Sequence, residues 1–203
     1  TNPIKSIYSA DEAFYLLSLQ DSQTVYCFDM RSALPDGSNR VTTWAGVNPR
    51  SLALLQDGSI YLGREDGVFK YEGYKDNNNP YLMSYYSNPL NFGNSTNLKF
   101  LKKFKITVIG NVASPTTLVW GYDYGGAYIK KSFSTQLDNT PISEYNVSQF
   151  NIGKFSTGVD IQRPTINTSG SGSVVTIGIE STVNGAPYSI QQIDVQALLG
   201  RLI

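Results

Sequence analysis

The sequence predicts an all-β protein in which partial β-propeller-like meanders are followed by a jelly-roll-like β-sandwich. Apolar residues recur with a period of two or in short runs of four to seven, and Gly, Asp-Gly, Asn-Gly and Pro separate these runs. Tyrosine accounts for 14 of the 203 residues, and aromatic and β-branched side chains favour pleated, half-buried surfaces. No apolar run reaches the roughly 20 residues that a membrane-spanning helix needs, so no membrane span is expected.

The first predicted domain, residues 1–95, consists of antiparallel meanders. Its expected strands are 13–19, 24–29, 41–44, 51–55, 59–63, 68–72 and 81–86. Asp57-Gly58 and Asp66-Gly67 separate three of these strands and predict hairpin turns. Two meanders spaced by roughly 35 to 40 residues resemble propeller blades. Since two blades cannot close a propeller, either further blades precede them in a longer chain or they form a small open sheet.

The second predicted domain, residues 96–203, follows a polar segment rich in Asn and Pro. Its expected strands are 98–109, 117–123, 127–134, 173–181 and 188–195. Asn184-Gly185 is expected to join the last two strands as a hairpin. Strands of this length and spacing fit a β-sandwich.

The composition excludes several kinds of chemistry. The chain has no histidine, which rules out Ser-His-Asp triads and imidazole metal ligands. Cys27 is the single cysteine, so an intrachain disulfide and a thiolate zinc site are also ruled out. We therefore expect no cofactor and no metal site, and what remains is either chemistry by carboxylates alone or no chemistry at all.

Charge is distributed unevenly although the formal net charge is zero. Residues 1–95 hold 10 acidic and 7 basic residues, whereas residues 96–203 hold 6 acidic and 9 basic ones. In the expected strand 98–109, simple alternation places Lys99, Lys103 and Lys105 on one face, opposite an apolar face. The lysine face is interpreted either as solvated surface or as a basic stripe that attracts phosphates.

An aromatic group around residue 120 is the candidate for carbohydrate binding. Trp120, Tyr122 and Tyr124 lie close together with Asp123 and could stack against sugar rings. The alternative is that one of these rings belongs to the core. A polysaccharide depolymerase would need two suitably spaced carboxylates, and the adjacent pair Glu65-Asp66 is better interpreted as a solvated turn.

Several stretches together resemble one family of viral proteins. They are Leu101-Lys102-Lys103, the run from Trp120 to Gly126, residues 174–180, residues 184–194 and the ending Gly200-Arg201-Leu202. In this order they are similar to the tail tubular protein B, or tail nozzle, family of short-tailed bacteriophages, which includes packaged-DNA stabilisation proteins. The resemblance covers most of residues 98–203, and the predicted blades agree with the propeller of that family.

The resemblance implies a non-enzymatic structural protein of the virion. Family members form a ring, usually a hexamer, below the portal and adaptor proteins, and the ring retains packaged DNA and conducts it during infection. Because members are several times longer, the resemblance implies that these residues are a C-terminal portion. The start of the chain, which has no Met, no basic region and no apolar segment, fits a fragment or processed product. The alternative functions are a tail-associated glycan-binding module and a carboxylate-dependent depolymerase.

Overall fold

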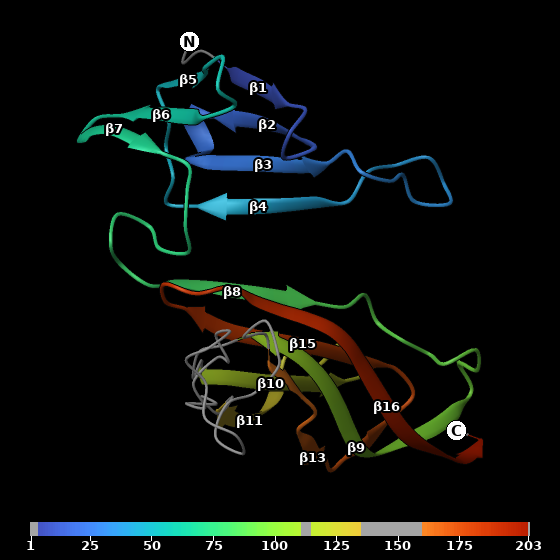
Figure 1. Cartoon of the computed structure of the whole chain (residues 1–203). Coiled ribbons are helices and arrows are strands. Elements are labelled where there is room, and N and C mark those ends of the chain that lie inside the picture. Colours follow the sequence, from blue (N-terminus) through green and yellow to red (C-terminus); the bar gives the residue numbers. More distant parts are fainter. Residues whose placement is uncertain (1–3, 111–114, 135–159, 203) are drawn as a thin grey trace, which may run out of the picture. The chain divides into compact units, whose positions relative to one another are not determined.

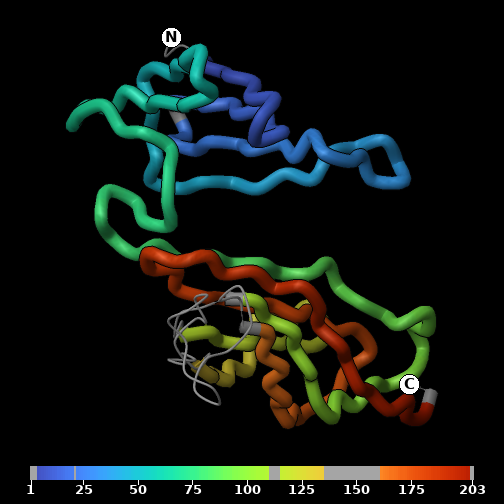
Figure 2. Tube along the Cα trace, in the orientation of Figure 1, coloured from blue at the N-terminus to red at the C-terminus, as the bar shows by residue number. Residues whose placement is uncertain are grey.

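The computed structural model describes residues 4–110, 115–134 and 160–202 (Figure 1). These residues form antiparallel sheets together with one short 3-10 helix, Gln20–Ser22, so the all-β prediction is confirmed. The chain divides into two compact units, Thr1–Glu72 and Gly73–Ile203, which can be followed along the chain in Figure 2. Each unit has its own hydrophobic core.

The first unit contains two sheets whose strands follow sequence order. One is β1-β2-β3-β4 and the other is β5-β6-β7, with every neighbouring pair antiparallel. Their bounds are β1 Lys5–Ser9, β2 Phe14–Leu19, β3 Thr24–Asp29, β4 Val41–Ala45, β5 Ser51–Leu54, β6 Ile60–Arg64 and β7 Gly67–Lys70. Both meanders are therefore present, in the sequential order that propeller blades have, and the first contains the additional strand β1.

Asp57 and Gly58 shape the β5–β6 turn through backbone geometry. Gly58 has φ 81°, and the Asp57 carboxylate accepts from the amide of Ser59 at 3.0 Å. The amide of Leu55 donates to the carbonyl of Ser59 at 2.9 Å, so three residues rather than two form the loop. A left-handed glycine at the end of a three-residue loop is a common hairpin geometry.

The core of the first unit lies between residues of both sheets. Leu16, Val25 and Ile60 are almost completely buried and form one cluster with Phe14. Trp44 stacks on Tyr71 with ring centroids 5.6 Å apart, and Phe14 meets Tyr71 edge-on at 5.6 Å. Burial of each large aliphatic side chain stabilises the fold by about 1.5–3 kcal/mol.

The second unit is a sandwich of two sheets. The β10 sheet has the order β11-β10-β15-β8, with β8 Tyr81–Tyr86, β10 Pro115–Tyr122, β11 Tyr128–Ser134 and β15 Val175–Val183. In the β9 sheet, β9 Asn97–Gly110 pairs along one edge with β16 Tyr188–Leu202. Its other edge pairs in turn with β12 Asp160–Gln162, β13 Thr165–Asn167 and β14 Ser171–Gly172.

Apolar side chains from both sheets fill the sandwich. The fully or nearly buried members are Leu101, Phe104, Ile106 and Val108 from β9, Leu118 and Trp120 from β10, Ile166 from β13, and Val175, Ile177 and Ile179 from β15. Alternate residues of β16, including Ile193 and Val195, pack against this cluster. The period of two that predicts these strands therefore corresponds to the face of each strand that packs into the sandwich core.

Two details of the predicted organisation differ from the structure. The boundary between units lies at residues 72/73 rather than 95/96, because β8 pairs with β15 from Tyr81↔Val183 to Tyr86↔Gly178. The expected hairpin across Asn184-Gly185 is wrong, because β15 belongs to the β10 sheet and β16 to the β9 sheet. The turn at Gly185, with φ 78°, instead carries the chain from one sheet to the other.

Candidate functional site

The predicted basic stripe is divided between the two faces of β9. The pairing with β16 shifts between Lys103↔Gln196 and Leu101↔Ala197, so β9 has one extra residue at Lys102. Such a β-bulge reverses the direction of the side chains that follow it. The expectation that Lys99, Lys103 and Lys105 share one face is therefore wrong, because Lys99 is fully buried whereas the other two are exposed.

Lys99 has a structural role inside the second unit. Its ammonium group donates to the carbonyl oxygen of Asn94 and, at 2.7 Å, to that of Ser173. These two hydrogen bonds join the start of β9 to the segment that precedes β15. A buried ammonium group needs such partners because it has left water.

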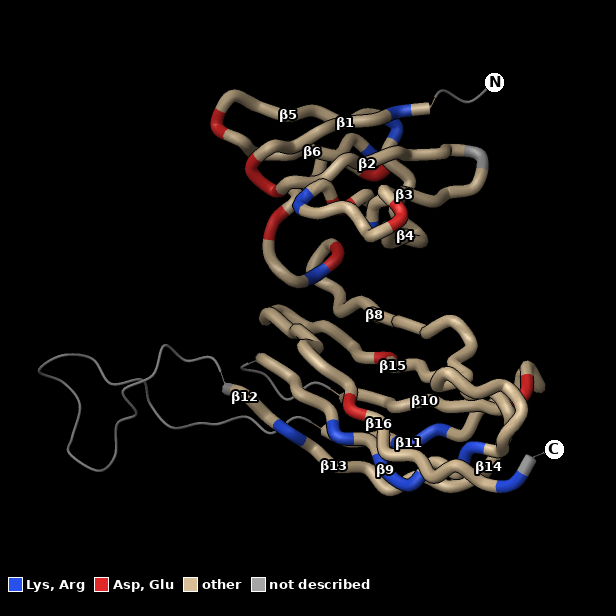
Figure 3. Tube along the Cα trace, turned by 90° about the vertical axis from the view of Figure 1, so that its right-hand side faces the viewer, with Lys and Arg blue, Asp and Glu red and all other residues tan. Residues whose placement is uncertain are grey.

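Lys103 and Lys105 remain as an exposed basic pair on the outer face of the β9 sheet. Figure 3 shows several Lys and Arg positions of this unit on β9, with others on β11 and on the segment before β8. Lys103 lies between Asn167 and Gln196, and Lys105 lies between Thr165 and Asp194. The pair is thus bordered by polar side chains and by one carboxylate.

The expected aromatic platform does not form, because its three rings have different environments. Trp120 is 2% exposed, lies in the sandwich core and donates from Nε1 to the carbonyl of Ser169 at 3.0 Å. Tyr122 packs against the same core, and its hydroxyl donates to the same carbonyl at 2.8 Å. Only Tyr124 is open to solvent, at 77% exposure.

Asp123 and the pair Glu65-Asp66 also have local partners. The Asp123 carboxylate accepts from the amide and hydroxyl of Ser173, at 2.7 and 2.6 Å, and the hydroxyl bond is the main cause of its lowered pKa. Glu65 pairs with Arg50 at 3.0 Å and Asp66 with Arg64 at 3.3 Å. Each of these carboxylates therefore has partners beside a turn, and Glu65-Asp66 lies on the exposed turn between β6 and β7, as the turn interpretation predicts.

A different aromatic surface lies on the outer face of the β10 sheet. Tyr86 of β8 lies over Gly178 of β15, its cross-strand partner, and Tyr128 of β11 lies over Gly121 of β10. The two ring centroids are 5.9 Å apart with the planes tilted by 56°. The rings therefore extend from opposite edges of the sheet and meet over its centre.

The glycines allow the two rings to lie close to the strands. A Cβ atom at Gly178 would come within 2.5 Å of the Tyr86 ring, and one at Gly121 within 2.9 Å of the Tyr128 ring. Val119, on the same outer face, is completely buried. Tyr86 and Tyr128 nevertheless remain 42% and 45% exposed, so much of each ring is open to solvent.

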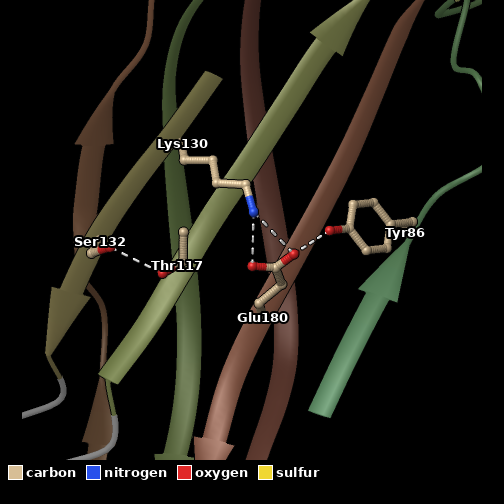
Figure 4. A network of polar contacts seen from close by, with 5 residues as sticks. All are labelled: Tyr86, Thr117, Lys130, Ser132 and Glu180. Atoms are coloured by element: carbon tan, nitrogen blue, oxygen red, sulfur yellow. Dashed lines mark hydrogen bonds and ion pairs between the residues drawn. The ribbon is translucent and has the colours of Figure 1, made fainter. Parts of the chain in front are cut away.

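A polar row lies beside the two rings. Figure 4 shows the Glu180 carboxylate between Lys130 and Tyr86. Lys130 Nζ is 3.2 Å from Glu180 Oε2, and the Tyr86 hydroxyl donates to Glu180 Oε1. The hydroxyls of Thr117 and Ser132 are hydrogen-bonded to each other at 3.0 Å. We call Tyr86, Tyr128, Lys130 and Glu180 the tyrosine face.

The hydrogen bond between Tyr86 and Glu180 shifts both pKa values in opposite directions. It is the main cause that raises the pKa of Tyr86 to about 12, and burial adds to this. The same bond, together with Lys130, lowers the pKa of Glu180. At neutral pH the phenol therefore keeps its proton, and the carboxylate stays ionised between two donors.

Sequence reasoning missed the tyrosine face because its residues are far apart in the chain. Tyr86 and Glu180 are separated by 94 positions and meet only through the β8–β15 register. A usable signal was present in the expected strands, since Gly121 and Gly178 each interrupt an apolar run. Glycine within a strand marks a close approach by another group.

Comparisons with known proteins do not assign the chain to a family. No family model matches the sequence, and the search of curated proteins found no match either. Within residues 4–110, 115–134 and 160–202, no helix is long and apolar enough to cross a membrane. The same residues contain no group of three or more Cys, Asp or Glu side chains placed to hold a metal ion.

Proposed function

We propose that the chain is a non-enzymatic structural component of a bacteriophage tail, where it forms part of a ring that retains and conducts packaged DNA. The observation that carries the proposal is the position of the stretches that resemble the tail nozzle family. They lie on β9, on β10 with the turn after it, and on β15 and β16. These strands make up most of the sandwich.

The stretches that resemble this family contain several core residues of the sandwich. Leu101, Trp120 and Ile179 are each 2% exposed or less and belong to the same core. Core residues fix the packing of the sheets, so a resemblance at these positions supports a common architecture. The order of two blade-like meanders followed by a sandwich supports the same proposal.

In the proposed ring, the exposed side chains of Lys103 and Lys105 are the groups that contact DNA. In a closed ring, symmetry repeats this pair once per subunit and produces a basic band. Two lysines per subunit attract phosphates without sequence preference, and such contacts weaken as salt increases. A chain with zero formal net charge then holds DNA weakly enough for it to pass.

Assembly is the first test. Sedimentation velocity and negative-stain microscopy of the full-length protein should show closed rings, with a hexamer expected, which bind portal and adaptor proteins. A monomer at all concentrations, alone and with those partners, would overturn the proposed role.

The basic pair is tested separately on the assembled ring. The double variant Lys103→Gln/Lys105→Gln should weaken binding to a random-sequence duplex. It should also reduce the slope of the logarithm of the binding constant against the logarithm of the salt concentration by roughly 2 per contacting subunit. The control Lys5→Gln/Lys75→Gln removes the same charge elsewhere and should leave both quantities unchanged. Equal losses in the two double variants would contradict a DNA-facing role for β9.

A further inference from the structure

The tyrosine face has the features of a carbohydrate-binding surface, and we propose that it binds a neutral polysaccharide. The rings of Tyr86 and Tyr128 supply two adjacent apolar faces for the C–H surfaces of sugar rings. Glu180 and Lys130 lie beside them and can bond sugar hydroxyls. The inference does not depend on the proposed tail function.

The two rings are held in place before any ligand arrives. Each lies against a glycine across the strand pair, and the Tyr86 hydroxyl is also fixed by Glu180. Tyrosine side chains held in this way lose little conformational entropy on binding. Exposure of more than two fifths of each residue leaves surface available for contact.

The polar row supplies both kinds of hydrogen-bonding group. Glu180 is an acceptor and Lys130 is a donor, and their atoms are 3.2 Å apart. A sugar hydroxyl both donates and accepts, so neighbouring hydroxyls can bond to the two groups together. The hydroxyls of Thr117 and Ser132 continue the row on β10 and β11.

The charges of the tyrosine face select a neutral ligand. Lys130 and Glu180 form one ion pair, so this face carries no net charge. An anionic ligand would meet the Glu180 carboxylate, and a cationic ligand would compete with Lys130. The two rings lie side by side, and an oligosaccharide that contacts both should therefore bind more tightly than a single sugar.

Affinity electrophoresis of the full-length protein tests the proposal. The probes are three soluble neutral polysaccharides, laminarin, dextran and galactomannan, each cast into native gels at increasing concentration. We expect at least one of them to slow the protein relative to a non-binding standard. If none of the three slows the protein, the proposal is overturned.

Variants then locate the binding surface. Tyr128→Ala should weaken binding of the retarding polysaccharide at least tenfold, whereas Tyr128→Phe, which keeps the ring, should bind within twofold of the original protein. Tyr124→Ala removes a more exposed ring outside the tyrosine face and should have no effect. Glu180→Gln should weaken binding because it removes the charged acceptor.

Folding is measured alongside binding for every variant. The thermal midpoint and the far-ultraviolet circular dichroism spectrum should show that Tyr128→Ala and Glu180→Gln remain folded at the gel temperature. Should Tyr128→Ala unfold, Glu180→Gln decides the matter instead. Unchanged affinity in folded Tyr128→Ala or folded Glu180→Gln would overturn the assignment.

Discussion

The buried ammonium group of Lys99 donates to the carbonyl oxygen of Ser173 at 2.7 Å, across 74 positions of sequence. Its second acceptor is the carbonyl of Asn94, so one side chain joins three segments of the second unit. The bulge at Lys102 makes this arrangement possible because it turns Lys99 toward the inside.

Replacement of Lys99 by methionine should destabilise the second unit. Methionine has a similar length but leaves both carbonyls without the Lys99 donor, and we expect a loss of about 2 kcal/mol in the free energy of unfolding. Urea denaturation gives this quantity directly. Lys102→Met, an exposed neighbour, is the control and should change it by less than about 0.5 kcal/mol. Equal effects in the two variants would contradict a structural role for Lys99.

Substitution of Gly178 by alanine should displace the Tyr86 ring. The new Cβ atom would lie 2.5 Å from Cδ1 of that ring, so either the ring or the strand has to move. Overpacking of this kind costs about 1–3 kcal/mol. A double-mutant cycle with Tyr86→Ala isolates the effect, because Gly178→Ala should cost much less once the ring is absent. If Gly178→Ala cost the same stability with and without Tyr86→Ala, the strain would not come from contact with the Tyr86 ring.

Stability should depend on pH through the Tyr86–Glu180 bond at both ends of the scale. The pKa of Glu180 is lower than its ordinary 4.5. The contribution of the ionised carboxylate to the stability of the fold is therefore present above pH 4.5 and is lost as pH falls through the lowered pKa. The pKa of Tyr86 is raised from 10.0 to about 12, so its contribution is present below pH 10.0 and is lost as pH rises toward 12.

Urea midpoints of the original protein and of Tyr86→Phe, measured from acid to alkaline pH, test this dependence. The difference between the two proteins should be largest in the neutral range and should shrink toward both extremes. A difference that stays constant with pH would show that the phenol–carboxylate bond does not contribute to stability.

The two units should unfold in separate transitions because each has its own core. Leu16→Ala removes a fully buried side chain from the first unit, and Ile179→Ala does the same in the second. Each substitution should cost about 2–5 kcal/mol and lower the midpoint of one transition only. Differential scanning calorimetry distinguishes this outcome from a single cooperative transition that both variants shift.

Sequence periodicity predicted the strands well but did not predict how distant strands meet. The expected strands 24–29 and 81–86 coincide with β3 and β8, because alternation and turn residues are local properties. The face on which Lys99 lies depends on a bulge opposite β16, and that register is set about 90 residues away. The same reason explains why the sequence placed the aromatic surface at Trp120, whereas the paired rings on the outer face of the β10 sheet are Tyr86 and Tyr128.

The pairing of β9 with β16 has a consequence for synthesis of the protein. β9 ends at Gly110, but its longest partner spans Tyr188–Leu202, so the ribosome must make a further 77 residues before β16 begins. Until then one edge of β9 lacks its partner strand, a condition that favours aggregation. The first unit pairs only nearby strands and can fold during this interval.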